Sequence, residues 1–86
     1  MDLMHVLLAL QKGKTRATYT AVAERLNTSP RSVMKGQPHT PLHSWVVNKR
    51  TKMPTGYSEE NRHVDLLANS RVIQSGDELD TYLENH

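Results

Sequence analysis

Two stretches decide the fold of this 86-residue chain: TYTAVA at residues 18–23 and SPRSV at residues 29–33. The first predicts a helix that Thr18 opens and a turn over residues 27–28 closes. Its inward face consists of Ala21, Val22, Ala23 and Leu26. Ser29 is expected to cap a second helix over residues 30–35, with Pro30 in its first turn and Gly36 at its end. The pair predicts a helix-turn-helix with Arg31 at the position of a DNA-reading side chain.

Apolar positions before this pair predict a first helix from Asp2, its cap, to Gly13, its end. Its apolar stripe consists of Leu3, Val6, Leu7 and Leu10. A short loop rich in lysine and arginine follows. Two prolines make residues 37–42 an ordered loop, and residues 45–47 are short and β-prone.

The second half begins with a basic segment, residues 48–56, which we expect to form a loop or hairpin that serves as a wing. Ser58 is expected to cap a helix whose first turn holds two glutamates. The apolar stripe of that helix is Val64, Leu67 and Ala68. Residues 71–73 predict a short strand.

Ser75 and Glu78 match a capping box before a last helix. Leu79, Tyr82 and Leu83 of this helix either close the core or serve a partner, and their helical spacing favours the core. We therefore expect a single domain over residues 1–86. It is mainly α, a winged helix-turn-helix-like DNA-binding domain with a short β wing.

Charge is unevenly distributed, although the formal net charge is only +2. Glu24 is the only acid between Lys12 and Arg31, and residues 35–52 hold four basic residues and no acid. Acids gather after Ser58. A basic front and an acidic tail suit a polyanion bound to one face, and the alternative is a solvated surface without a partner.

Several classes of function are disfavoured by what the chain lacks. Without cysteine there is no disulfide, thiolate metal site or thiol nucleophile, which fits a reducing cytoplasm. His39 and His43 are four residues apart, but the neighbouring prolines argue against a helix there, so we expect no metal and no cofactor. No nucleophile elbow or phosphate-binding glycine loop occurs, so an enzyme is not expected. The apolar start is too short for a membrane span and lacks signal-peptide features, so we expect a cytoplasmic protein.

DNA binding requires cations for phosphates, a docking element and a group that reaches bases. The candidate DNA-binding residues are Lys14, Arg16, Tyr19, Ser29, Arg31, Ser32 and Lys35. Further cations are Lys12, Arg25, Lys49, Arg50 and Lys52. The alternatives are that Tyr19 is a buried aromatic at a helix start and that Arg31 is a solvated first-turn residue.

The order of these motifs resembles the DNA-binding domain of alkylguanine-DNA alkyltransferases and, more closely, their non-enzymatic relatives, the alkyltransferase-like proteins. The family's Gly-Lys-x-x-Thr-Tyr stretch resembles residues 13–19, with one extra residue here. Its Ala-Arg-x-Val-Gly helix and Gly-Asn-Pro hinge resemble residues 30–34 and 36–38. The reactive Pro-Cys-His-Arg-Val-Val motif falls in residues 41–47. The Gly-Tyr-Ser loop and Leu-Leu-Ala helix resemble residues 56–58 and 66–68, so the resemblance covers residues 3–73.

The family's nucleophilic cysteine is missing here. Depending on the alignment, its position falls on Leu42, His43 or Trp45, and the acid of the catalytic relay falls near Ser70. Because a thiolate is the nucleophile that accepts an alkyl group, the resemblance implies binding without transfer.

The resemblance also implies roles for individual residues. Arg31 enters the duplex as a finger, and Tyr19 presses on the backbone phosphate of the extruded nucleotide. The alkylguanine pocket consists of His43, Trp45, Val47, Tyr57 and Ser58, with Trp45 or His43 as its floor. A damaged base costs less to extrude, which provides selectivity. The expected partners are double-stranded DNA with alkylated guanine and then repair proteins; we expect a monomer and no membrane.

Two other functions remain open at this point. One is a winged-helix transcription regulator that binds undamaged DNA, which dimerisation would favour. The other is a protein-interaction module that retains the fold and has lost DNA binding, which an absence of duplex affinity would favour.

Overall fold

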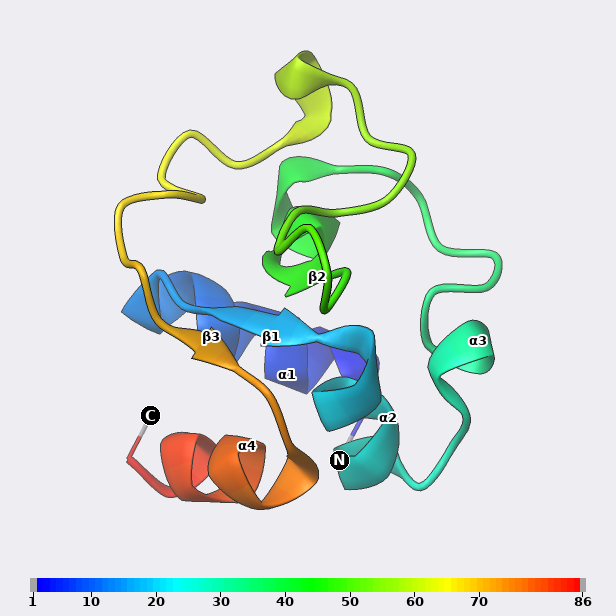
Figure 1. Ribbon diagram of the computed structural model, residues 1–86, viewed down its shortest axis with the longest axis vertical. Coiled ribbons are helices and arrows are strands. Elements are labelled where there is room, and N and C mark those ends of the chain that lie inside the picture. The colour runs from blue at the N-terminus through cyan, green and yellow to red at the C-terminus, as the bar shows by residue number, and fades with distance from the viewer. Residues whose placement is uncertain (1, 86) are drawn as a thin grey trace.

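Three short parallel strands run through the middle of the molecule in the order β2-β1-β3 (Figure 1). The computed structural model describes residues 2–85. The central strand is β1 (Arg16–Thr18), with β2 (Val46–Val47) on one side and β3 (Val72–Ile73) on the other. Ala17 pairs with both edges of the sheet, because it lies opposite Val46 and Ile73.

Helices make up most of the regular structure, which agrees with the expected mainly-α class. The four α-helices are α1 (Leu3–Gly13), α2 (Tyr19–Leu26), α3 (Pro30–Val33) and α4 (Gly76–Glu84). Two 3₁₀ turns are η1 (Pro41–Trp45) and η2 (Glu59–Asn61). In Figure 1, α1 lies behind the strands and α4 lies below them. Among the described residues, no helix combines the length and apolar character that crossing a bilayer requires.

Three of the predicted caps are confirmed. The side chains of Asp2, Thr18 and Ser75 each accept a hydrogen bond from the backbone N–H three residues further on. Each satisfies an amide that the first turn of a helix leaves unpaired. The predicted cap by Ser29 is wrong, because its hydroxyl lies 2.9 Å from that of Ser32 and makes no capping bond. The predicted cap by Ser58 is also wrong, because its side chain makes no such bond to η2.

The core lies where the helices meet the sheet. Its largest fully buried side chains include Leu7, Leu10, Trp45, Ile73 and Leu79. α4 closes this core, as predicted, since Leu79 and Tyr82 are buried. Two polar contacts join it to α2: the carboxylate of Glu24 accepts the Gly76 N–H at 2.7 Å, and Arg25 pairs with Asp80.

α1 ends at Gly13, as predicted, but the left-handed residue at the helix end is not the glycine. Lys14 adopts the left-handed conformation, with φ 51°, and Gly13 is the last helical residue. A side chain at Gly13 would overlap the Tyr82 hydroxyl, which donates a 2.6 Å hydrogen bond to the Ala9 carbonyl. Glycine is therefore required by the close approach of α4 rather than by the helix end.

The predicted basic loop after α1 contains the central strand instead. Arg16, Ala17 and Thr18 are all buried. A strand covered on both faces has no alternation of polar and apolar residues, so the usual sequence signal is missing.

The second half departs further from the prediction. Residues 48–56 form a loop without a strand, so the short β wing is not formed and a winged helix is not confirmed. Parallel strands need crossover connections, which rules out a hairpin between them. Nor is there a helix over residues 62–71, where turns lead the chain back to β3. The apolar stripe predicted for that helix is wrong, because Val64 and Leu67 are 95% and 66% exposed and Ala68 is exposed as well. The buried residue of this segment is Leu66, which was not in the predicted stripe.

Candidate nucleic-acid interface

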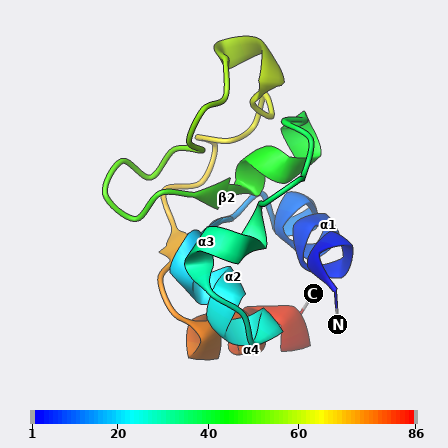
Figure 2. The ribbon, with the colours of Figure 1, turned by 90° about the vertical axis from the view of Figure 1, so that its right-hand side faces the viewer.

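An open depression of about 520 Å³ lies between α3, the start of α2 and the loop after β2. Its lining consists of Tyr19, Pro30, Arg31, Ser32, Met34, Lys35 and Thr55. Figure 2 faces α3, with the loop after β2 to its left. The structure thus brings together predicted DNA contacts from α2, α3 and the segment after α3, namely Tyr19, Arg31, Ser32 and Lys35.

Tyr19 forms a wall of this depression. It is the first residue of α2 and is half-buried against the core. Its hydroxyl accepts the backbone N–H of Thr55 at 3.2 Å. This hydrogen bond ties residues 48–56 to the helix pair, which the sequence did not predict.

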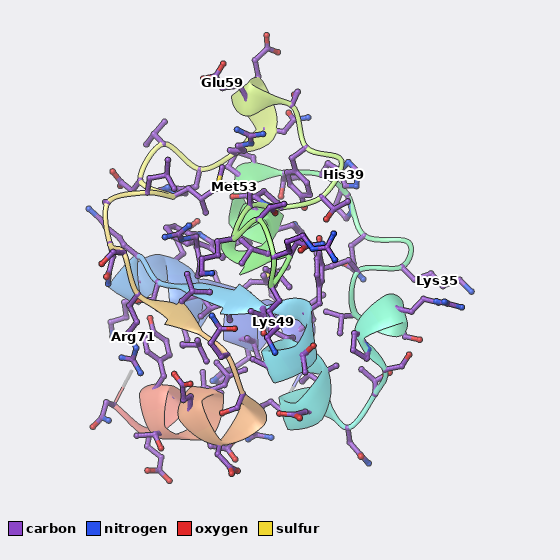
Figure 3. The ribbon with its side chains drawn as sticks, in the orientation of Figure 1. Lys35, His39, Lys49, Met53, Glu59 and Arg71 are labelled. Carbon is purple, nitrogen blue, oxygen red and sulfur yellow. The ribbon has the colours of Figure 1, made fainter. Side chains whose placement is uncertain are left out.

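The cations of the depression are open to solvent. Arg31 and Lys35 are exposed, and neither forms an ion pair within the described residues 2–85. Lys35 reaches away from the ribbon in Figure 3. α3 has only four residues, so side chains rather than a helix dipole must supply any attraction for phosphate. Ser29, at the cap position of α3, is also exposed.

The loop beside the depression carries further exposed cations, Lys49, Arg50 and Lys52. Asn48 organises it, because its side-chain oxygen accepts the N–H of Arg50 at 2.8 Å and its carbonyl accepts the N–H of Lys52 at 2.7 Å. Lys52 has φ 60°, in the left-handed region.

Two predicted DNA contacts lie elsewhere. Lys14 occupies the turn between α1 and β1, on the opposite side of the molecule from α3 (Figure 1), and pairs with Asp65 at 3.3 Å. Arg16 is only 6% exposed. Its guanidinium donates to the carbonyls of Lys52 and Asn69 at 2.8 and 3.2 Å, and burial lowers its pKa. The prediction of direct DNA contact is therefore wrong for Arg16.

The central residues of the predicted pocket are packed in the interior. Trp45 and Val47 are fully buried, and the Trp45 ring lies 4.8 Å from that of His63. His43 is 5% exposed, and its Nδ1 lies 2.7 Å from the Thr40 hydroxyl. Burial lowers the pKa of His43. None of the three lines the depression beside Tyr19.

Tyr57 is also buried and does not line the depression. Its ring stacks on His39, with centroids 4.5 Å apart and planes 26° apart. Its hydroxyl is buried without a hydrogen-bond partner among the described residues. Burial, and then the neighbouring Tyr19, raise the pKa of Tyr57 to about 12. Ser58 follows on the exposed surface.

No sequence pattern indicated Thr55, which lies between Pro54 and Gly56 and completes the lining of the depression. Within the described part of the chain, no group of three or more metal-binding side chains is positioned to hold a metal ion. Comparisons with protein-family models, curated proteins and solved structures found no match for this chain.

Proposed function

We propose that this protein binds double-stranded DNA and recognises alkylated guanine by extruding it from the duplex, without chemical conversion. The observation that carries the proposal is that Tyr19 and Arg31 line the same open depression, together with Lys35. The resemblance assigns pressure on the phosphate to Tyr19 and insertion into the duplex to Arg31, and Lys35 is one of the cations predicted to contact phosphates. The bound lesion would then mark the site for repair proteins.

In this proposal, exposed cations on two elements provide the affinity. Lys35 belongs to the segment after α3, and Lys49 and Arg50 belong to the loop after β2. Each cation that neutralises a phosphate releases a condensed counterion, so the affinity depends on salt. Arg31, which lines the depression together with Tyr19, fills the space that the base leaves.

Tyr57 provides the contact to the extruded base. Its buried hydroxyl has no partner among the described residues, and such a group gains from a hydrogen bond to a ligand. His39 now covers one face of its ring, as a stacked base would. Extrusion costs a few kcal/mol and less for a poorly paired base, which favours alkylated guanine.

A transcription regulator that binds undamaged DNA is the second candidate. The burial of His43, Trp45 and Val47 favours it, because side chains so buried are not exposed to an extruded base. Such a regulator needs the depression and its cations but does not unstack a base.

Fluorescence anisotropy with a labelled duplex tests the DNA interface. Lys35→Ala and Lys12→Ala form a matched pair, since both lysines are exposed and only Lys35 lines the depression. Loss of one phosphate contact reduces the log–log salt slope by about 0.9. We expect this reduction for Lys35→Ala and the parent slope for Lys12→Ala. Equal effects of both variants would show that binding depends on overall charge and not on the depression. A parent affinity that does not change with salt would reject DNA binding.

A further inference from the structure

Arg16 is an unusual residue for the centre of a small sheet. It is 6% exposed, and among the described residues no carboxylate pairs with it. Its two terminal nitrogens instead donate to backbone carbonyls, while its Nε is buried without a partner. A desolvated charge that meets only neutral acceptors is costly, so packing alone does not explain an arginine here.

The two carbonyl groups that accept hydrogen bonds from Arg16 show which segments it joins. The Lys52 carbonyl belongs to the loop after β2, and the Asn69 carbonyl belongs to the segment that returns to β3. Residues far apart in the chain are thereby joined beneath the exposed cations Lys49 and Arg50. A guanidinium suits this place because its planar fork presents two donors at once, whereas a lysine ammonium is a single point.

The loop is fixed at three further places. Asn48 and Met53 close its base, since the Asn48 N–H donates to the Met53 carbonyl at 3.0 Å. The Asn48 side chain holds its tip through the N–H of Arg50. Beyond the loop base, the Thr55 N–H donates to the Tyr19 hydroxyl. These hydrogen bonds tie the loop to itself and to α2, with its cations exposed and Thr55 at the depression.

We propose that Arg16 is a positioning residue that holds the loop after β2 so that Lys49 and Arg50 contact phosphates of the DNA that occupies the depression. This inference rests on the proposed function, because the ligand is the same duplex. Arg16 touches no DNA itself. Its buried charge lies beneath the loop and adds to the positive potential that attracts phosphate.

The test is the salt dependence of duplex binding at a temperature where each variant is folded. If Lys35, Lys49 and Arg50 each neutralise one phosphate, the parent log–log slope is about −2.7. We expect about −0.9 for Arg16→Met and the same value for the double variant Lys49→Gln/Arg50→Gln, since both lose two contacts. The triple variant Arg16→Met/Lys49→Gln/Arg50→Gln should match the double variant, because the two changes remove the same contacts.

A purely structural Arg16 gives a different result. Arg16→Met would then lower the melting temperature but keep the parent slope. Arg16→Lys, which keeps the charge and loses the fork, carries the test if Arg16→Met does not fold; a parent slope in that variant would overturn the inference. A flat titration of the parent protein would instead reject the proposed function, so the two failures are distinguishable.

Discussion

The contact between Gly13 and Tyr82 leads to a prediction opposite to helix propensity. In a helix, alanine is ordinarily more stable than glycine by roughly 0.5–1 kcal/mol. A Cβ at Gly13, however, would overlap the Tyr82 hydroxyl and lie 3.0 Å from the ring carbon that carries it. Tyr82 would have to move, and its 2.6 Å hydrogen bond to the Ala9 carbonyl would be lost.

These effects together set the expected change in the free energy of unfolding. Overpacking costs about 1–3 kcal/mol and a lost hydrogen bond about 0.5–1.5 kcal/mol, against the gain from alanine, so Gly13→Ala should destabilise by about 2 kcal/mol. For a domain of this size, that lowers the melting temperature by about 10 °C.

Thermal unfolding followed by circular dichroism measures the effect, with Tyr82→Phe as the second arm of a double-mutant cycle. Removing the hydroxyl removes the worst overlap but leaves the ring, so the penalty of Gly13→Ala should be smaller in that background. A Gly13→Ala variant as stable as the parent would refute the reasoning, and an undiminished penalty beside phenylalanine would exclude the hydroxyl as its cause.

Three further predictions concern single groups. Tyr57→Phe should leave the melting temperature unchanged or raise it, because the lost hydroxyl is buried without a partner, whereas Tyr82→Phe should lower it; a marked loss in Tyr57→Phe would contradict this. Because burial lowers the pKa of His43, the unfolded state binds its proton first, and stability should fall as the pH drops through about 6.5. His43→Gln should flatten that part of the pH profile, and an unchanged profile would assign it to other groups. The intact mass should stay constant after incubation with an alkylated oligonucleotide, since the chain has no thiol; a gain of one alkyl group would contradict binding without transfer.

Local features of the sequence predicted local features of the fold. The caps at Asp2, Thr18 and Ser75 depend on side chains and amides three residues apart, so they are visible in the sequence. The strand β1 is not visible in the sequence, because it forms by pairing with residues 46–47 and 72–73, which lie far along the chain. Short strands buried on both faces lack the periodicity that would reveal them.

In the candidate site, too, local features were predicted and contacts between distant residues were not. The helix-turn-helix pattern made Tyr19 and Arg31 candidate DNA contacts, and the structure places both at one depression. Two hydrogen bonds join residues 36 positions apart: the Thr55 N–H donates to the Tyr19 hydroxyl, and Arg16 donates to the Lys52 carbonyl. The groups at Thr55 and Lys52 belong to the backbone, so the side chains at these positions do not reveal the contacts. No residue pattern could therefore have predicted either attachment.

The central claim is that the protein unstacks an alkylated guanine, and a fluorescent base analogue beside the lesion reports this most directly. The parent protein should raise the fluorescence of the alkylated duplex well above that of the plain duplex at equal occupancy. Arg31→Ala should lose most of that rise while still binding, because the arginine holds the gap that the base leaves. Equal fluorescence for the two duplexes with the parent protein would contradict lesion recognition and leave the protein as a binder of undamaged DNA.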